Sequence, residues 1–525
     1  MSDQQRMLLA AVLMAVVLFV SWTLTDRGDD GDRAAPAARQ PAAAQPPDTM
    51  ATVPAPPPDT TAAVPDTIPE GAGEGSVTVM LMDSAGADTL VSARLDMLGG
   101  GLGRWELHRF HNLTNGRGPR IDLGSEGILP VVRDGEMVPF VYDGPDTLIV
   151  GPGSASVRLE GPRGGWRQYT FHAGSYAFDV EQEGIPSGLR IPAGAVPVSE
   201  EGVNPGDYFR AVWRRAGDLE DEKSEDLEGT AEHDEVDWGG VKTKYFSILI
   251  INTAEEEDII FTPAEGLSPA ATMMVDRARV YAGPVGYERL QSLGIGAEHM
   301  VDFGWPVIRW IGRIIFWFIS VPLSFIGNWG VRIIILTAVL KTLLWPLTTK
   351  SFTSMQKMKE VQPKLKQLQE KYKSDPKRQQ MEMQKLYKEE GVNPLGGCFP
   401  LLLQMPFFFA MYRVLSNMVE LRGADFILWI DDLSRPEILL PFGGSVLGLE
   451  GIGLLALLMG VSMFIQQKMS VSDPSQKTMV YVMPIFMTWL FMRFPAGLTL
   501  YWFVNNLLTI GQQELIKKRL EKASG

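Results

Sequence analysis

The chain has 525 residues, which is enough for two or three folded units. Residues 1–300 hold 23 Lys and Arg against 46 Asp and Glu, whereas residues 301–525 hold 25 against 16. The resulting net charges, −23 and +9, indicate that the two parts occupy different environments. Cys398 is the only cysteine, which excludes an intramolecular disulfide, and the lack of a Walker A loop excludes a nucleotide-driven motor within this chain.

The first 75 residues contain an apolar run followed by a low-complexity stretch. Residues 7–22 are apolar and follow a short polar start, which predicts a signal-anchor transmembrane helix over residues 1–26. A cleaved signal peptide is the alternative, although no A-x-A site follows closely. Residues 27–75 are rich in Pro and Ala and contain almost no large apolar residues, so we predict a disordered linker there.

Residues 76–300 have the pattern of an all-β domain. Short alternating runs, such as Ser76–Met82 and Tyr245–Ile251, are separated by clusters of Gly, Pro and Asp. This pattern predicts a β-sandwich of many short strands. The acidic run Asp218–Glu235 is interpreted as an exposed loop.

Signals for catalysis are weak. His108 and His111 lie three residues apart, but a metal site would need further ligands, so surface or core histidines are the favoured interpretation. The chain contains no Cys/His cluster and no G-x-S-x-G motif. We therefore expect no enzymatic activity, no cofactor and no metal.

Residues 301–328 contain an apolar run that is interrupted by charge and proline. Arg309 and Arg313 lie one turn apart, and Pro322 interrupts the end of the run. An interfacial amphipathic helix, with three tryptophans at headgroup level, fits this pattern better than a membrane span.

Five further apolar segments predict a helical membrane core over residues 329–513. Three of them are shorter than about 20 residues, so polar flanks must lie at the interface. The five predicted spans are 329–349, 397–419, 451–467, 479–494 and 497–513.

The charges of the loops predict the orientation of these spans. The segment 350–396 carries eleven Lys and Arg against six acids, and the loop 468–478 and the tail 514–525 are also basic. The loop 420–450 is acidic. The positive-inside rule places the three basic segments in the cytoplasm and the acidic loop outside. With the anchor helix, this gives six spans, both termini inside, and residues 27–328 in the periplasm of a cell with two membranes.

Lys341 lies near the centre of the first core span. A charge at this depth costs roughly 2.5–3.5 kcal/mol on insertion scales. No acidic residue lies within the five predicted spans to pair with it, and Thr337 shares its helical face. A lysine that reaches the interface with its side chain is the alternative, but the route is long from mid-span. We therefore predict a hydrated cationic cavity inside the helix bundle.

Other predicted spans supply polar side chains for this cavity. Gln404 lies in the second core span, and Tyr501, Asn505 and Asn506 lie in the last. Each of them alone could form an ordinary hydrogen bond between helices. Together with a lysine, they are predicted to line the cavity.

The basic segment 350–396 predicts a helical hairpin on the cytoplasmic face. Its first helix covers Ser354–Tyr372, and Ser374-Asp375-Pro376 forms the turn into a second helix that ends near Tyr387. A basic face resting on anionic lipid is one interpretation, and a docking surface for ribosomes or targeting factors is the other. The lysines predicted to form this surface are Lys357, Lys359, Lys364, Lys366, Lys371 and Lys373.

Four stretches of the second half resemble the YidC/Oxa/Alb family of membrane protein insertases. They are Gly391–Pro406, Trp345–Met358, Phe494–Leu500 and Tyr501–Gln513. The signal anchor and the large β-domain resemble the Gram-negative subtype. The resemblance implies a polytopic α-helical membrane protein with a five-helix insertase core and an all-β periplasmic domain similar to a supersandwich.

The family resemblance also implies a mechanism and partners. A hydrophilic groove receives nascent membrane proteins, and their apolar segments slide into lipid, with or without the Sec translocon. Lys341 aligns with the groove cation, where relatives usually have arginine, and Trp502 replaces a family tyrosine. The implied groove residues are Lys341, Thr337, Gln404, Tyr501, Trp502 and Asn505. The implied substrate slide comprises Phe399, Pro400, Met405, Phe408, Thr488 and Leu490.

Two other functions remain open from the residues alone. A transporter or channel could use Lys341 as an anion site, although we find no inverted repeat. A membrane-anchored sugar enzyme could occupy residues 76–290. Of these functions, membrane protein insertion is the one that we expect.

Overall fold

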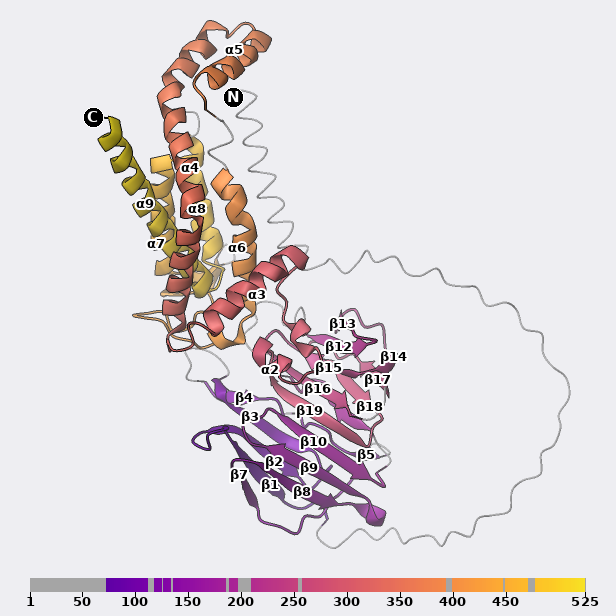
Figure 1. Ribbon diagram of the computed structural model, residues 1–525. Coiled ribbons are helices and arrows are strands. Elements are labelled where there is room, and N and C mark those ends of the chain that lie inside the picture. Colours follow the sequence, from indigo (N-terminus) through magenta and orange to yellow (C-terminus); the bar gives the residue numbers. More distant parts are fainter. Residues whose placement is uncertain are drawn as a thin grey trace, which may run out of the picture. The chain divides into compact units, whose positions relative to one another are not determined.

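The structure is a computed structural model of the whole chain. It describes residues 72–111, 118–124, 126–133, 136–185, 188–196, 209–253, 257–392, 399–446, 449–470 and 477–524. A β-rich part is followed in the sequence by a helical part, as predicted (Figure 1). The predicted anchor helix and nearly all of the predicted linker lie outside the described residues.

Three sheets form the β-rich part. The first has the order β4-β3-β2-β1-β7, the second β13-β12-β15-β16-β19-β10-β9-β8, and the third β11-β18-β17-β14. The first sheet comprises Arg120–Asp122, Leu102–His111, Thr89–Asp96, Ser76–Met82 and Thr147–Val150, in that order. The second comprises Asp218–Lys223, Arg210–Arg215, Trp238–Lys242, Phe246–Asn252, Arg277–Pro284, Ala177–Glu183, Trp166–His172 and Ser154–Glu160. The third comprises Leu189–Ile191, Ala270–Met273, Glu257–Thr262 and Ala231–Val236, and a small pair joins β5 (Val132–Arg133) to β6 (Glu136–Met137).

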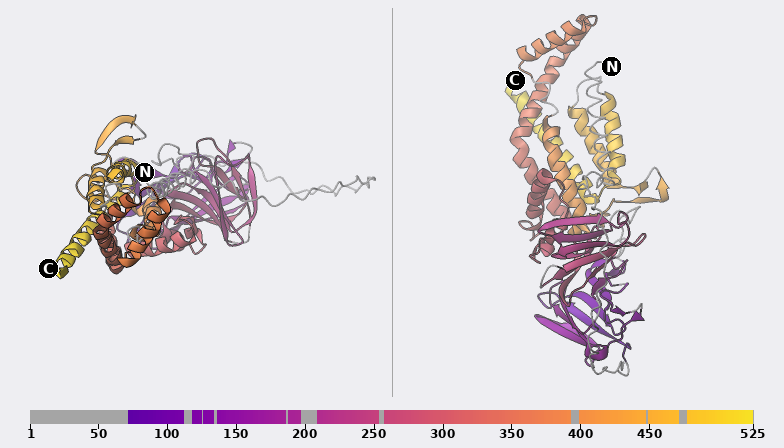
Figure 2. Two further views of the ribbon diagram at one scale, coloured as in Figure 1. Left: turned by 90° about the horizontal axis from the view of Figure 1, so that it is seen from above. Right: turned by 90° about the vertical axis from the view of Figure 1, so that its right-hand side faces the viewer.

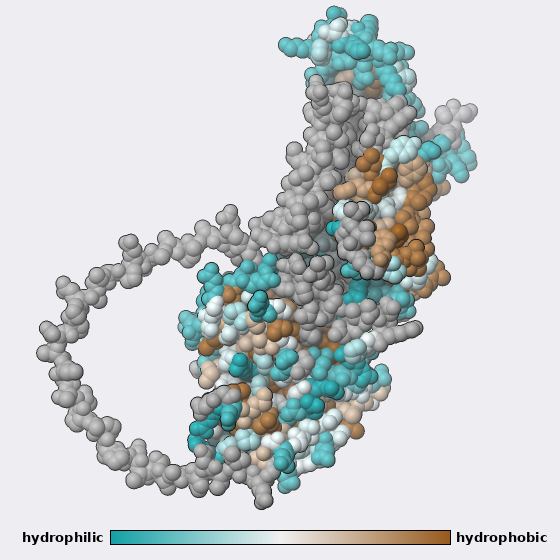
Figure 3. Space-filling model, turned by 180° about the vertical axis from the view of Figure 1, so that it is seen from behind, coloured by the Kyte–Doolittle hydropathy of each residue, from teal (hydrophilic) through white to brown (hydrophobic). Residues whose placement is uncertain are grey.

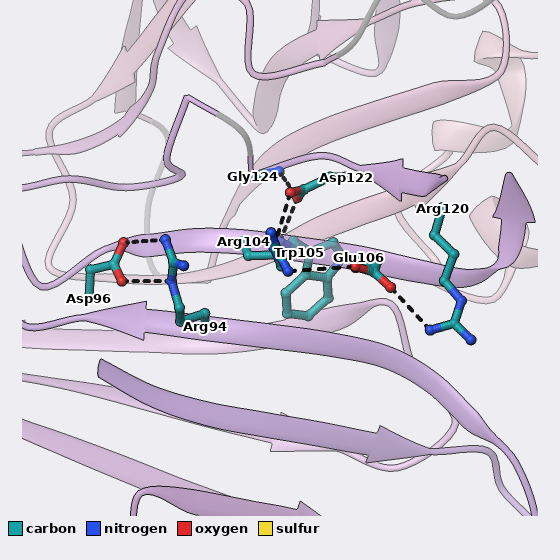
Figure 4. Close-up of polar contacts among 8 residues, drawn as sticks. All are labelled: Arg94, Asp96, Arg104, Trp105, Glu106, Arg120, Asp122 and Gly124. Atoms are coloured by element: carbon teal, nitrogen blue, oxygen red, sulfur yellow. Dashed lines mark hydrogen bonds and ion pairs between the residues drawn. The ribbon is translucent and has the colours of Figure 1, made fainter. Parts of the chain in front are cut away.

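The first two sheets share one apolar core. Trp105 on β3 is fully buried, and its Nε1 donates a 2.8 Å hydrogen bond to the carbonyl of Ala282 on β19. Its ring also packs on Phe178 of β10, with the centroids 4.9 Å apart. The opposite face of the first sheet is polar, and Figure 4 shows its ion pairs, among them Arg94 with Asp96. This alternation of inward apolar and outward polar residues is the pattern that predicts a sandwich.

Two of the predicted strands are confirmed, and one predicted loop is wrong. The runs Ser76–Met82 and Tyr245–Ile251 form β1 and, shifted by one residue, β16. The acidic run Asp218–Glu235 instead contributes the strands β13 and β14, each at the edge of its sheet. An edge strand keeps one side in solvent, so charged side chains are accommodated there and also oppose pairing with other chains.

Helix α3 (Pro306–Ser320) has one buried and one exposed face. Ile308, Ile315 and Ile319 are buried, whereas Trp310 and Trp317 are exposed. The turn after α3 is held by Arg332, which donates to three carbonyls: those of Ile319, Ser324 and Ile326.

Helices occur at all five predicted core spans. They are α4 (Trp329–Lys371), α6 (Phe399–Asn417), α7 (Leu454–Ser470), α8 (Lys477–Phe491) and α9 (Ala496–Ser524). Within the described residues, α4 is the one helix long and apolar enough to cross a membrane on length and composition, and Leu454–Met469 and Val480–Phe491 are shorter apolar helices.

Helix α4 is longer than the sequence suggested. The first predicted span and the first arm of the hairpin form one continuous helix, through Pro346 and Pro363. Proline lacks an N–H, but helices with neighbouring helices around them tolerate it. The second arm is α5 (Pro376–Glu389), and Asp375 caps its first turn by accepting from the N–H of Arg378.

The helical part has two distinct ends, which we call proximal and distal. The proximal end holds the starts of α4, α7 and α9 and the loop 418–453. There, Asn328 donates to the carbonyl of Phe426, and the N–H of Gly497 donates to the carbonyl of Leu433. The distal end holds the α4–α5 hairpin and the end of α7, where Lys359 Nζ lies 2.6 Å from the carbonyl oxygen of Met469. Successive helices therefore run in alternating directions between the two ends (Figures 1 and 2).

A short β-hairpin at the proximal end was not predicted from the sequence. Strands β20 (Leu440–Val446) and β21 (Leu449–Ile452) pair antiparallel immediately before α7. Several apolar residues on and beside it are exposed, and Figure 2 shows it projecting from the helices.

Candidate functional site

A small pocket lies between α4, α6 and α9, three helices that contact one another. Its volume is about 20 Å³, which leaves room for a single water molecule. Polar groups from all three helices face it. The lining residues are Thr337, Leu340, Lys341, Leu344, Thr348, Gln404, Phe407, Tyr501 and Asn505.

Lys341 contributes the only ionisable ammonium or guanidinium group among these lining residues. Lys341 is half-buried, and no acidic side chain is among the residues that line the pocket beside it. Thr337, one turn earlier, is buried and bonds its hydroxyl to the carbonyl of Ile333, 2.7 Å away, so its own hydrogen is already satisfied. The pocket therefore contains an amine group with no acidic partner among its lining residues.

Tyr501 and Asn505 present polar groups from α9. Both are buried, and the Tyr501 hydroxyl hydrogen-bonds with the side chain of Gln404 on α6. Because residues four apart lie on one face of a helix, the two α9 residues form one polar stripe. Five of the six residues assigned to the groove from the sequence thus meet in this pocket.

A row of polar side chains that was not predicted from the sequence continues from the pocket toward the distal end. Thr348 lines the pocket, and its Oγ1 accepts a 2.6 Å hydrogen bond from Nε2 of Gln512 on α9. Gln512 is 1% exposed, and its Oε1 has no partner among the described residues. Thr348 lies seven residues after Lys341 and Gln512 seven after Asn505, so helical spacing was a signal that could have found both.

Trp502, the sixth groove residue, does not line the pocket. Its ring packs edge-on against Phe408 of α6, with the centroids 4.9 Å apart, and against Phe491 of α8 at 5.4 Å. Its neighbour Tyr501 faces the pocket instead, because residues adjacent in a helix point about 100° apart.

The predicted slide residues lie in different helix contacts. Phe408 is buried against Trp502, whereas Thr488 on α8 packs against Gly460 of α7, where an added Cβ would lie 1.9 Å from its Oγ1. Met405 and Leu490 are half-buried. The side chains of Phe399 and Pro400 lie outside the part of the structure that is described.

Two of the six hairpin lysines form a hydrogen bond or an ion pair with the rest of the described protein. Lys359 bonds to the end of α7 as described above, and burial, together with neighbouring Lys517, lowers the pKa of its ammonium. Lys364 forms an ion pair with Glu390. The other four, namely Lys357, Lys366, Lys371 and Lys373, are exposed. The hairpin itself is stabilised by a small apolar core of Val361, Leu365, Met383 and Val392.

The surface of the helical part separates by polarity. Figure 3 shows an apolar band over the helices and a hydrophilic region over the α4–α5 hairpin. Exposed apolar side chains occur on several helices, including Val339 and Leu343 of α4, Val461 of α7 and Ile485 of α8. A wide belt of this kind is typical of helices that face lipid.

The histidine pair of the β-domain is part of the sheet. His108 Nε2 lies 2.6 Å from Ser92 Oγ and 3.2 Å from Arg120 Nη1. Burial, followed by the neighbouring arginine, lowers the pKa of its imidazole. A histidine bonded in this way within an ion-paired sheet surface has a structural role.

Two family models match the chain, one in each part. The model described as the 60Kd inner membrane protein matches residues 321–523, and the model described as the YidC periplasmic domain matches residues 139–318. The boundary between the two matches falls at the end of α3.

The chain is also similar to curated relatives and to a solved structure. The membrane protein insertase YidC of Syntrophobacter fumaroxidans is 47% identical over 256 residues, or 46% of this chain and 44% of that relative's own length. The one of Janthinobacterium sp. is 34% identical over 476 residues, or 82% of this chain and 83% of the relative. A crystal structure of an active YidC insertase, with its first transmembrane domain resolved, is similar at 19% identity and a TM-score of 0.38, over 80% of this chain and 90% of that chain. The match to the Janthinobacterium protein extends over both the β-rich and the helical part.

Proposed function

Because the chain belongs to the YidC family of membrane protein insertases, we propose that it receives nascent membrane proteins at the pocket around Lys341 and releases their apolar segments into the bilayer. The observation that carries this proposal is the ammonium of Lys341 among polar side chains of three helices, with no acidic partner among the residues that line the pocket. A half-buried cation within a membrane span attracts an acidic group and is costly to keep without a function.

The polar pocket lowers the barrier for the polar tail of a substrate. A substrate helix gains a few tenths of a kcal/mol for each Leu or Ile that enters the membrane. Its acidic tail, in contrast, is destabilised when it enters the membrane. The tail pairs with the ammonium of Lys341 while it crosses. The membrane potential then draws the tail outward with about 2.3 kcal/mol per charge per 100 mV. No nucleotide hydrolysis is needed for such a step.

An incoming chain enters by displacing side chains. The pocket has room for only about one water molecule, so α4 and α9 must separate to admit a chain. They separate where their contact is a polar one, because its hydrogen bonds can be replaced by bonds to the incoming chain. Thr348 and Gln512 form that part of the contact. The apolar segment leaves past the half-buried and buried side chains assigned to the slide, among them Met405, Phe408 and Leu490.

The protein is proposed to lie in the inner membrane with both termini in the cytoplasm. The distal end of the helices carries the exposed lysines and is the cytoplasmic end under the positive-inside rule. Residues 27–328 are then periplasmic, and α3 lies in the outer interface with Trp310 and Trp317 at headgroup level. The anchor helix supplies a sixth span.

Further partners are proposed at the cytoplasmic face. Exposed lysines of the hairpin, among them Lys357, Lys366, Lys371 and Lys373, present a surface for the ribosome, for signal-recognition targeting factors or for anionic lipid. The Sec translocon is the proposed partner for substrates with large periplasmic domains.

Reconstitution tests the role of Lys341. In proteoliposomes, Lys341→Ala is expected to slow insertion of a small phage-coat-like protein with an acidic tail, whereas Lys341→Arg retains it. The same substrate with its acidic residues replaced by amides serves as the control, because it should be indifferent to both variants. Wild-type insertion of the acidic substrate by Lys341→Ala would exclude the electrostatic role. Solute flux without insertion would favour a transporter.

A further inference from the structure

The β20–β21 hairpin exposes apolar side chains beside the start of α7. Ile438, Leu439, Leu440 and Phe442 are all exposed, with 60% of Leu440 and 43% of Phe442 accessible. No charged residue occurs between Glu437 and Glu450. An apolar cluster on a loop that faces water is unfavourable unless something covers it.

The hairpin is fixed to the first turn of α7. Glu437 accepts from the backbone N–H of Leu454 through one carboxylate oxygen and from that of Leu455 through the other, each at 3.0 Å. A carboxylate at the start of a helix satisfies free N–H groups and interacts favourably with the helix dipole. On the other side, Leu440 pairs with Ile452, two residues before α7 begins. The apolar residues of the hairpin are therefore held at the level of the first turn.

Helix α7 also exposes apolar side chains, beginning in its first turn. Leu457, Leu458, Val461 and Ile465 of that helix are also exposed. With 17 residues, α7 is about 25 Å long, close to the thickness of a bilayer core, so its first turn lies near one interface. The exposed apolar residues of the hairpin lie at the level of this first turn, so they are placed at the same membrane interface.

We propose that the β20–β21 hairpin lies in the outer membrane interface and buries Leu440 and Phe442 among headgroups and upper acyl chains. The proposal rests on the membrane orientation given under the proposed function. A two-stranded hairpin has unpaired backbone groups along its edges, and these exclude a deeper position in the hydrocarbon. Apolar side chains with a polar backbone match the interfacial region, where amphipathic elements enter by about 5–10 Å. Together with α3, whose last turn Arg332 of α4 holds through the carbonyl of Ile319, the hairpin provides a second contact with the outer leaflet.

Depth-dependent fluorescence quenching tests the position of the hairpin. In the full chain carrying Cys398→Ser, Phe442→Cys is labelled with an environment-sensitive fluorophore and reconstituted into phosphatidylethanolamine and phosphatidylglycerol vesicles. Lipids with a nitroxide near the headgroup are expected to quench the emission more strongly than lipids with a nitroxide near the chain end, as an interfacial depth implies.

Two further positions make the outcomes distinguishable. Leu457→Cys on α7 should be quenched by nitroxide lipids, whereas Ile149→Cys on β7, which is 65% exposed, should respond only to aqueous iodide. Iodide quenching at position 442 without lipid quenching would place the hairpin in water and overturn the proposal. Protection from both quenchers would point to a protein cover and also overturn it. Loss of lipid quenching at position 457 would instead refute the orientation of α7, and with it the topology under the proposed function.

Discussion

Thr348 on α4 and Gln512 on α9 are joined by a 2.6 Å hydrogen bond in which both partners are buried. The same threonine lines the pocket of Lys341, so the bond closes the distal side of that pocket. Gln512 also reaches the carbonyl of Trp345, at 3.4 Å, with the same amide nitrogen. The amide thus forms a buried polar link between α4 and α9, next to the polar side chains of both helices that line the pocket.

A double-mutant cycle measures the contribution of this hydrogen bond to the free energy of unfolding. We expect Thr348→Val and Gln512→Leu to be coupled by about 0.6 kcal/mol and at most about 1.7 kcal/mol, the range found for hydrogen bonds between membrane helices. Unfolding of the single and double variants in detergent provides the free energies. Ser462→Ala is the matched control, because Ser462 bonds to Asn506 and should be additive with Gln512→Leu. Additivity of the Thr348 and Gln512 changes would show that the bond contributes nothing.

Close packing of α7 on α8 predicts that a side chain added at Gly460 lowers the stability of the protein. A Cβ at Gly460 would lie 1.9 Å from Thr488 Oγ1, so Gly460→Ala is expected to destabilise the protein by about 1–3 kcal/mol. Adding Thr488→Ala removes the clashing oxygen and should recover part of the loss. Gly511→Ala on α9 is the control, since a Cβ there meets nothing within 4 Å and alanine favours helix. Equal thermal stability of Gly460→Ala and Gly511→Ala would contradict this account of the helix contact.

The hairpin lysines should divide into two classes. Lys366→Glu and Lys373→Glu change exposed side chains, so each should weaken binding to anionic vesicles, by about 1 kcal/mol for each charge lost, without lowering the melting temperature. Lys359→Glu breaks the bond to the carbonyl of Met469 and sets a negative charge at the end of α7. It is expected to lower the melting temperature. Vesicle sedimentation at two salt concentrations and thermal unfolding separate the classes, and a uniform effect of all three changes would argue against the division.

Glu420 is expected to make the stability of the folded state depend on pH, and its surroundings determine the sign of this dependence. Burial, with a smaller contribution from Glu288, raises the pKa of its carboxyl above the ordinary value of 4.5. The folded state therefore prefers the protonated acid, so Glu420 favours folding at acidic pH and this contribution is lost as the pH rises through the folded-state pKa. Glu420→Gln should raise the melting temperature at pH 7, and the difference should vanish below about pH 4, where the carboxyl is protonated in both states. A difference independent of pH would exclude ionisation as its cause.

The coarse architecture could be predicted from the sequence, because it depends on periodicity and charge. Alternation located β1 and β16, and apolar runs located the helices of the core. The acidic run that forms β13 and β14 was missed, since its charges are the signal of a loop and also that of a protected edge strand. The β20–β21 hairpin was missed because its residues resemble the adjoining span.

The pocket could be predicted only in part. Lys341, Tyr501 and Asn505 stand out because polar residues are rare in apolar helices. Trp502 was assigned to the groove by family resemblance, and its ring instead packs on Phe408 and Phe491. Which neighbour of a pair faces the pocket depends on the rotation of α9 against α4, and that rotation is set by tertiary contacts such as the one between Thr348 and Gln512.

The three hydrogen bonds of Arg332 couple the position of α3 to that of α4. One guanidinium on α4 fixes the last turn of α3 and the connection that follows it, and the same group lies 4.1 Å from the ring of Trp329. A connection held at three points does not act as a free hinge. Under the proposed function, a tilt of α4 that admits a substrate would also move the end of α3, and α3 would transmit this motion along the membrane surface.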